Sequence, residues 1–447
     1  MQVMKFGGTS VGTATNIRGV ENIITSNEKK IVVLSAMSGT TNSLVEIASR
    51  IKKGNHEGAL EIVNDLKQHY LSTAKELSSD SESFNKLEKL LNSEFEILAQ
   101  KASEKYSDQL EKEIVVTGEI ITTKMITLYL KGKGVNVELL WALNFMRTDN
   151  NGEPDYYYVQ ESINREINKY PNCNLFITQG FICKTMKGEV SNLTRGGSDY
   201  SATIIGAAIH ASEVIIWSDK DGLLNCDPRF VEQTYPLKTI SYEEAEELAY
   251  FGAKILHPSC IFPVKGLKIP VFLKNTMNPQ APGTLISADS IGQKGEIIAL
   301  AAKDDVVAIY IKSASMLNAY GFLLKIFNVF NMYRTSVDMI TTSEVAVAVT
   351  ITDTTHLHDI VRELSKFGEI EYFENQTIIC AVGNIPAQQS DISVKIFEAM
   401  SDIQIKMISY GASKRNITML IDSKDKTRAL NNLNKNLFKD KLCSVKN

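Results

Sequence analysis

Short apolar segments alternate with longer helical segments through residues 1–289 of this 447-residue chain. Residues 31–36 read IVVLSA and residues 214–217 read VIIW, and such runs suit strands that are buried on both faces of a parallel sheet. The sequence predicts strands over 31–36, 135–140, 175–183 and 214–217, and helices over 43–52, 119–130, after Gly197 and, as a pair, over 57–106. This alternation predicts an α/β fold with helices over both faces of a largely parallel sheet. Ligands of such sheets bind beyond the carboxyl ends of the strands.

Three glycine-containing segments hold the candidate functional residues of this region: KFGGTS at 5–10, TRGGSD at 194–199 and FGAKILHP at 251–258. Glycine lets the backbone approach a ligand closely, and the N–H groups at a helix start attract phosphate or carboxylate. Arginine adds a planar fork suited to such anions, and aspartate can orient a lysine or a metal-bound water. Taken alone, TRGGSD could equally be a helix N-terminus with an aspartate in its first turn. The three segments together indicate phosphoryl transfer.

Composition argues against several other classes of protein. The chain is 44% hydrophobic and 22% charged, as soluble globular proteins are, and its length suits two or three domains. A formal charge of −4 does not favour binding to nucleic acid or to an anionic membrane. The six cysteines are scattered without a CxxC pair, which favours reduced cytosolic thiols over disulfides or a zinc site. The first glycine turn begins at Lys5, so we expect no signal peptide, and no apolar run approaches the ~20 residues of a membrane helix.

The sequence pattern changes after residues 279–295, whose two prolines and three glycines predict an exit from the first domain. The first part of the remaining chain is predicted to contain strands over 306–312, 336–340, 345–351 and 369–373, with helices over 319–332 and 356–367. The second part is predicted to contain strands over 376–382, 406–409 and 417–421, with helices over 393–400 and 426–438. These are two βαββαβ units at a spacing of roughly 70 residues. We therefore expect a catalytic domain over 1–289 and a regulatory region over 290–447, with units at about 306–374 and 375–447 that could be interleaved.

KFGGTS, TRGGSDYSA and FGAKILHP, in this order, resemble the signature segments of the aspartokinases, and the resemblance extends over essentially the whole chain. It implies an amino-acid kinase fold followed by paired ACT domains, which sense end-product amino acids. It also implies transfer of the γ-phosphoryl group of ATP to the β-carboxylate of L-aspartate, giving 4-phospho-L-aspartate, the first step toward lysine, threonine and methionine. We expect no homoserine dehydrogenase region, so the chain resembles the monofunctional enzymes, and we expect it to be cytoplasmic.

A carboxylate substrate is already ionised at neutral pH, so this reaction needs no general base. Alignment of the reactants and neutralisation of the transferring group must then supply the catalysis. The resemblance assigns Lys5 and Lys254 to the phosphates and Asp199 to the orientation of the lysines. For aspartate, Arg195 matches the α-carboxylate through a bidentate fork and Glu119 matches the α-ammonium by charge. The other positions that match the substrate site are Ser35, Thr41, Phe181 and Ser198.

Several of these positions also have a purely structural interpretation. Glu119 lies at an expected helix start, where a carboxylate complements the helix dipole. Ser35 and Thr41 could cap a loop, and Lys5 could be a solvated lysine at a strand end. The family match favours the binding roles over these readings.

The nucleotide side matches the family less completely. The resemblance places the backbone N–H groups of Gly7 and Gly8 at the phosphates. The matching nucleotide positions are Lys5, Gly7, Gly8, Ser218, Asp219, Leu224, Arg229 and Lys254. The family usually has a tyrosine at Leu224, so any base or ribose contact of that ring is in doubt, and Trp217 is expected in the core. Mg²⁺ is expected with ATP, held mostly by phosphate oxygens and water because the sequence shows no dedicated carboxylate cage.

The tail resembles the effector region of the lysine-sensitive class. The matching positions are Met316, Phe322, Leu323, Ser336, Val337, Asp338, Thr342, Ser343 and Glu344. The resemblance implies that Asp338 and Glu344 bind the amino groups of lysine. It also implies that backbone groups near Phe322 and Leu323 bind its carboxylate. Ala319 replaces a serine that is common there, and Val337 and Leu323 could instead be plain core residues. Such pockets form between the ACT units of two chains, which implies a homodimer or a dimer of dimers.

Two other functions remain open at this point. Another amino-acid kinase, such as acetylglutamate kinase or glutamate 5-kinase, would share the fold and the lysines, but not KFGGTS together with paired ACT units. A catalytically silent amino-acid sensor would use only the tail. Intact Lys5, Asp199, Arg195 and Lys254 argue against a silent protein, which would be free to lose them.

Overall fold

The computed structural model describes residues 1–193, 196–252, 256–288, 296–316, 320–385 and 390–439. The chain forms two compact units. The first comprises residues 1–223, 238–242 and 255–290, and the second comprises residues 224–237, 243–254 and 291–447.

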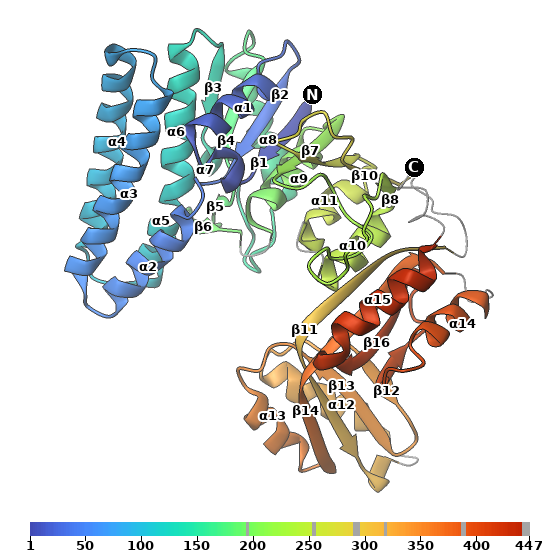
Figure 1. Ribbon diagram of the computed structural model, residues 1–447. Helices are drawn as coiled ribbons and strands as arrows, with labels where there is room; N and C mark the ends of the chain where they lie inside the picture. The colour runs from blue at the N-terminus through green and yellow to red at the C-terminus, as the bar shows by residue number, and fades with distance from the viewer. Residues whose placement is uncertain (194–195, 253–255, 289–295, 317–319, 386–389, 440–447) are drawn as a thin grey trace. The chain divides into compact units, whose positions relative to one another are not determined.

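An eight-stranded sheet forms the centre of the first unit, in the order β3-β4-β2-β1-β7-β9-β10-β8 (Figure 1). Its strands are β1 (Gln2–Phe6), β2 (Lys30–Leu34), β3 (Val137–Leu140), β4 (Leu175–Gln179), β7 (Glu213–Ser218), β8 (Thr239–Ile240), β9 (Val271–Asn275) and β10 (Thr284–Ile286). All neighbouring strands run parallel except β9 and β10. The prediction of a largely parallel sheet between helices is confirmed. A short hairpin, β5 (Ile182–Lys184) with β6 (Val190–Asn192), forms a separate ladder.

The two faces of this sheet carry different helices because successive strand residues point to opposite sides. Met4 and Phe6 of β1 belong to a core shared with helices α1 to α6, whereas Lys5 points to the face on which α9 packs. The helical elements of this unit are η1 (Gly8–Val11), α1 (Ala14–Ile24), α2 (Thr40–Lys52), α3 (His56–Leu77), α4 (Ser81–Ala102), α5 (Asp108–Val115), α6 (Thr117–Gly132), α7 (Ala142–Phe145), α8 (Tyr156–Asn168), α9 (Gly197–Ala208), η2 (Pro258–Cys260) and α11 (Phe262–Lys265). The predicted helix pair over 57–106 corresponds to α3 and α4, whose starts are capped by Asn55 and Asp80.

Three predicted boundaries in this unit were wrong. The strand expected over 175–183 is broken after Gln179, because Phe181 adopts φ 68° and turns the chain into β5. The helix expected from 43 begins at Thr40, after Gly39 in the left-handed conformation. The expected exit over 279–295 contains the strand β10 before residue 289.

The second unit contains a six-stranded antiparallel sheet in the order β12-β13-β11-β14-β16-β15. Its elements are α10 (Tyr242–Tyr250), β11 (Glu296–Lys312), η3 (Ala314–Met316), α12 (Phe322–Met332), β12 (Ile340–Thr342), β13 (Ala346–Ile351), α13 (Leu357–Leu364), β14 (Glu369–Asn384), α14 (Ser390–Ala399), β15 (Met407–Ser409), β16 (Asn416–Asp422), η4 (Ser423–Asp425) and α15 (Lys426–Leu437). The two βαββαβ repeats share their longest strands. One half of β11 and of β14 belongs to each repeat, so the units are interleaved.

This interleaving corrects two expectations. The separate strands expected over 369–373 and 376–382 form one strand, β14, whose irregularity lies near Asn375, at φ 55°. The strand expected over 336–340 begins only at Ile340, because residues 335–339 have no regular structure. None of the helices among the described residues is both long and apolar enough to cross a membrane.

Candidate active site

The carboxyl ends of four parallel strands meet at one edge of the first sheet. Phe6 lies in register with Leu34 and Trp217, and Leu34 lies in register with Gln179. The residues that follow these four therefore emerge side by side. They include Gly7, Ser35, Gly180 and Ser218, so the edge gathers segments that are far apart in the sequence.

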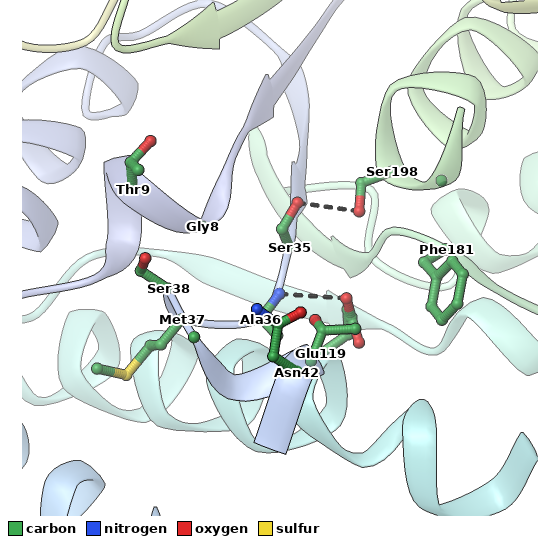
Figure 2. A pocket seen from close by; sticks show the side chains of 13 residues that line it. Gly8, Thr9, Ser35, Ala36, Met37, Ser38, Asn42, Glu119, Phe181 and Ser198 are labelled. Carbon is green, nitrogen blue, oxygen red and sulfur yellow. Dashed lines mark hydrogen bonds between the residues drawn. The ribbon is translucent and has the colours of Figure 1, made fainter. Parts of the chain in front are cut away.

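A cavity of about 430 Å³ opens at this edge (Figure 2). It is lined by Gly8, Thr9, Ser35, Ala36, Met37, Ser38, Gly39, Thr41, Asn42, Glu119, Phe181, Gly197 and Ser198. The structure thus brings together Gly8 and five predicted substrate residues: Ser35, Thr41, Glu119, Phe181 and Ser198. Sequence reasoning missed Thr9, Ser38 and Asn42, although the run of small polar residues from 37 to 42 was a usable signal.

Helix N-termini surround this cavity. Thr41 lies in the first turn of α2, Glu119 in the first turn of α6, and Ser198 in the first turn of α9. The unbonded N–H groups and the helix dipole at each start favour negative charge. A small ligand that carries carboxylate or phosphate groups fits such a field.

Glycines allow the segments around the cavity to approach one another. A Cβ placed at Gly180 would lie 2.4 Å from the Cβ of Ser198, and one placed at Gly118 would lie 2.8 Å from the Cβ of Ala36. Ser198 is thereby brought within reach of Ser35, whose hydroxyl donates to Ser198 Oγ at 2.9 Å (Figure 2). These contacts hold the start of α9 against the end of β2.

The carboxylate of Glu119 is buried in the wall of the cavity, with 3% of the residue exposed. Its Oε1 accepts a hydrogen bond from the Ala36 N–H at 3.3 Å, while its Oε2 has no hydrogen-bond partner among the described residues. Burial raises the pKa of Glu119 to about 7, opposed by its backbone hydrogen bonds and by the charge of Lys5. An unsatisfied buried carboxylate of this kind calls for a cationic or hydrogen-donating ligand.

Lys5 and Asp199 form an ion pair beside the cavity. Lys5 Nζ lies 2.6 Å from Asp199 Oδ1, and the two side chains are only 12% and 19% exposed. Asp199 directly follows the cavity residue Ser198, and a Cβ placed at Gly7 would lie 3.4 Å from Lys5 Nζ. The ammonium therefore lies between a carboxylate and the first glycine turn, and the reading of Lys5 as a solvated surface residue does not hold.

Comparisons with family models and with known relatives identify the family of this chain. Residues 1–275 match the amino acid kinase family, and residues 379–437 match an ACT domain. The chain is 33% identical over 448 residues to the lysine-sensitive aspartokinase 3 of Escherichia coli K12, covering 98% of this chain and 99% of that protein. The chain belongs to the aspartokinase family. It is also 33% identical to the chloroplastic aspartokinase 1 of Arabidopsis thaliana, covering 98% of this chain and 80% of that protein.

Solved structures of E. coli aspartokinase III resemble this aspartokinase over 98% of its length. The complex of that enzyme with aspartate and ADP matches with a TM-score of 0.84 at 32% identity, and all of its chain is covered. Its complex with lysine and aspartate matches with a TM-score of 0.78 at 33% identity, with 99% covered. Because the likeness spans the kinase and ACT regions together, it favours aspartokinase over the other amino-acid kinases.

The predicted nucleotide positions of this aspartokinase are placed less closely together than the substrate positions. The Gly7 N–H donates to the Trp217 carbonyl at 3.3 Å, a long bond that a phosphate would have to replace. Trp217 is buried and stacks on Phe6, as expected of a core residue. Ser218 ends β7, and the side chain of Asp219, which follows it, is half exposed.

The remaining nucleotide positions lie outside the first unit or outside the described residues. Leu224 and Arg229 belong to the second unit, where Leu224 bridges to Pro236 and the guanidinium of Arg229 pairs with Asp227 at 2.5 Å. The nucleotide residue Lys254 lies outside the described residues. The same is true of the substrate residue Arg195 and of Ala319 in the effector region. Their roles stay predictions.

A buried cluster of hydroxyl groups beneath the cavity was not predicted. Tyr70 of α3 is fully buried, and its hydroxyl lies 3.1 Å from Thr40 Oγ1 and 2.9 Å from Thr122 Oγ1. Thr122 also accepts the Met37 N–H at 3.2 Å. Burial raises the pKa of Tyr70 to about 12, so its hydroxyl stays protonated at neutral pH. The cluster ties the loop before α2 to the helix that carries Glu119.

The predicted effector positions all lie in the first repeat of the second unit, but they differ in exposure. Phe322 is buried, while Met316 and Val337 pack against the core of the repeat. Leu323 is 39% exposed, so it is not a core residue. Four polar positions are exposed: Ser336, Thr342, Ser343 and Glu344. The Asp338 side chain is only 4% exposed and is already paired within the chain.

Proposed function

We propose that the cavity binds L-aspartate for the ATP-dependent phosphorylation that gives 4-phospho-L-aspartate. The observation that carries this proposal is the buried, half-satisfied carboxylate of Glu119, whose Oε2 has no hydrogen-bond partner among the described residues. The α-ammonium of aspartate supplies the missing donors and a compensating charge. The relative's complex with aspartate and ADP supports the same choice of substrate and nucleotide.

Two opposite charges of the site, matched to the two charged groups on the α-carbon of the substrate, would fix its orientation. Glu119 takes the α-ammonium and Arg195 takes the α-carboxylate, while the hydroxyls of Ser35, Thr41 and Ser198 are available to the rest of the molecule. In this orientation the β-carboxylate is left for the side of the cavity beside Lys5. A one-carbon-longer substrate would not place its carboxylate at the same point, so aspartate would be preferred over glutamate.

Phosphoryl transfer then depends on alignment and charge, since the attacking carboxylate needs no base. Lys5 would neutralise the transferring group, Asp199 would keep the Lys5 ammonium in place, and Lys254 would act as the second cation on the nucleotide phosphates. Gly7 and Gly8 allow the phosphates to approach the backbone. Mg²⁺ would enter with ATP, neutralising phosphate charge. The described residues contain no cluster of three or more metal ligands, so phosphate oxygens and water would hold it.

Catalysis and regulation are assigned to different parts of the chain. We place catalysis in residues 1–289 and regulation in residues 290–447, where the family model for an ACT domain matches. Helix α12 exposes Leu323, Leu324 and Phe327 by 39%, 64% and 36%. A second copy of the chain would cover this apolar face, which supports a homodimer or a dimer of dimers. We also assign the enzyme to the cytoplasm.

Purified protein given Mg²⁺, ATP and L-aspartate should release ADP and form an acyl phosphate that hydroxylamine traps as a hydroxamate. The physical reason is the pairing of a cationic phosphate site with charges complementary to aspartate. Coupled ADP release and the hydroxamate colour reaction measure the two products. Equal rates with glutamate or N-acetylglutamate would overturn the substrate assignment, and no ADP release at all would favour the silent sensor.

Free lysine should inhibit this activity through the first repeat, because that repeat holds the predicted effector positions. The exposed Glu344 can be tested alone, so Glu344→Ala should raise the lysine concentration for half inhibition while leaving the uninhibited rate intact. A coupling of ~1–3 kcal/mol between effector and active site corresponds to changes of about 5- to 150-fold. Threonine and methionine serve as controls in the same assay. If millimolar lysine changes neither the rate nor the melting temperature of the wild type, the effector assignment fails.

A further inference from the structure

The buried carboxylate of Asp338 is held by three side chains of the second unit. Its Oδ1 accepts hydrogen bonds from Lys303 Nζ and from the Tyr250 hydroxyl, both at 2.8 Å. Its Oδ2 accepts a bond from Thr352 Oγ1 at 2.6 Å. Lys303 also lies over the ring of Tyr250, with Nζ 4.6 Å from the ring centroid. These four residues, the Asp338 cluster, satisfy the carboxylate before any effector arrives.

The Asp338 cluster lies next to a segment that matters for catalysis. Tyr250 is the last residue of α10, and the chain continues as Phe251-Gly252-Ala253-Lys254 into the third glycine segment. Lys254 follows Tyr250 by only four positions. The hydrogen bond from Tyr250 to Asp338 therefore ties the effector region to the stretch of chain that leads directly to a catalytic lysine.

A second contact fixes the same segment independently. Gly252 adopts φ +113°, and a Cβ placed there would lie 2.3 Å from the carbonyl oxygen of Ala302. Its backbone is thus in direct contact with β11, one residue before Lys303. Farther back on α10, Glu247 accepts hydrogen bonds from Ser413 at 3.0 Å and Asn416 at 2.5 Å. The end of α10 is thus held through side chains by Asp338 and Lys303, and through its backbone by β11.

We propose that Tyr250 and Lys303 are positioning residues that hold the segment leading to Lys254, and that the side-chain ammonium of lysine inhibits by competing with them for Asp338. This inference rests on the proposed lysine effector. Asp338 cannot be a vacant counter-charge for lysine, because its oxygens already have an ammonium and two hydroxyls as partners. Binding of the effector must then displace a bond of the Asp338 cluster, and loosening Tyr250 releases the segment that follows it.

If Lys303 and Tyr250 compete with the effector, removing them should change inhibition by lysine in the opposite direction from removing residues that bind the effector. If Lys303 or Tyr250 merely contacted the effector, its removal would weaken inhibition. If they compete with it, removal leaves a buried carboxylate with fewer donors, and an incoming ammonium binds more tightly. The state in which the Asp338 cluster is broken also becomes easier to reach, so less effector is needed.

The test is the lysine concentration for half inhibition of Lys303→Met and Tyr250→Phe in the full-length enzyme. Both should become more sensitive to lysine, by about fivefold or more, the lower range of allosteric coupling. Lysine binding measured by calorimetry should tighten in parallel. Without lysine, Tyr250→Phe should raise KM for ATP more than it lowers kcat, because Lys254 acts on the nucleotide. Lys303→Arg, which keeps the charge, should restore the wild-type response.

Two matched variants control for general effects on this unit. Lys312→Met removes an exposed lysine of the same strand, and Tyr310→Phe removes the hydroxyl of a tyrosine whose ring packs on Phe373. Neither should change lysine sensitivity. Weaker or unchanged inhibition in both Lys303→Met and Tyr250→Phe would overturn the competition. A wild type that neither binds nor responds to lysine would instead refute the effector assignment, and an unchanged KM for ATP in Tyr250→Phe would refute the positioning role.

Discussion

Replacing Lys5 by alanine should lower kcat by a factor of roughly 10² or more, because we propose that this cation neutralises the developing charge of the transferred group. The ion pair with Asp199 at 2.6 Å and the low exposure of both side chains show that the ammonium is held in place before substrates bind. Such preorganisation is what makes a charge effective in the transition state. Steady-state rates at saturating ATP and aspartate measure kcat directly.

Two further variants separate charge from position. Asp199→Asn keeps Lys5 but removes its partner, so we expect a smaller loss of kcat, arising from a less well-placed ammonium. Lys53→Ala, which removes an exposed lysine at the end of α2, should leave the rate unchanged. Near wild-type turnover in Lys5→Ala would rule out the role given to this residue.

The alternation of elements in the first unit could be predicted because burial on both faces leaves a strong pattern. Strands such as Lys30–Leu34 and Glu213–Ser218 are short, apolar and bounded by polar segments, and the sequence predicts them within one or two residues. The errors arose where backbone conformation overrides hydrophobicity. Phe181 at φ 68° ends a strand that composition alone would continue, and no apolar pattern signals such a residue.

The interleaved second unit shows a different limit. The sequence predicts the strand residues of β14 on both sides of Asn375, but not that they form one strand shared by two repeats. That property depends on antiparallel pairing with β11 along its length, from Lys312 with Glu369 to Glu296 with Asn384, which are far apart in the sequence. Local sequence pattern does not encode which strands meet.

The candidate site was predictable where glycine segments mark it and unpredictable where it depends on distant pairs. Ser35, Glu119 and Ser198 do converge on one cavity. The partners of Asp338 could not be inferred, because Tyr250 lies 88 residues away in sequence and Lys303 lies 35 residues away. The low exposure of the Asp338 side chain, 4%, likewise depends on these distant partners and has no local sequence signal.

The pH dependence of kcat/KM for aspartate should follow the titration of Glu119. Burial raises its pKa to about 7, whereas the α-ammonium of aspartate requires the ionised carboxylate. As pH falls below about 7, protonated Glu119 accumulates in the free enzyme, and kcat/KM for aspartate should fall by up to about tenfold per pH unit. Above that value the curve should level off. At saturating aspartate, kcat should vary less, because the bound ammonium holds the carboxylate in its charged form.

Glu119→Gln tests this reasoning because it keeps the shape and the bond from the Ala36 N–H while removing the charge. We expect KM for aspartate to rise by about 10- to 100-fold, the range for a hydrogen bond to a charged group, with a smaller change in KM for ATP. The fall in kcat/KM at acidic pH should disappear as well. Glu94→Gln, which removes a buried carboxylate paired with Lys124 outside the cavity lining, is the matched control and should keep the wild-type pH profile. If the wild-type profile is flat across about pH 5.5 to 8.5, or Glu119→Gln binds aspartate as well as the wild type does, then Glu119 does not hold the substrate ammonium.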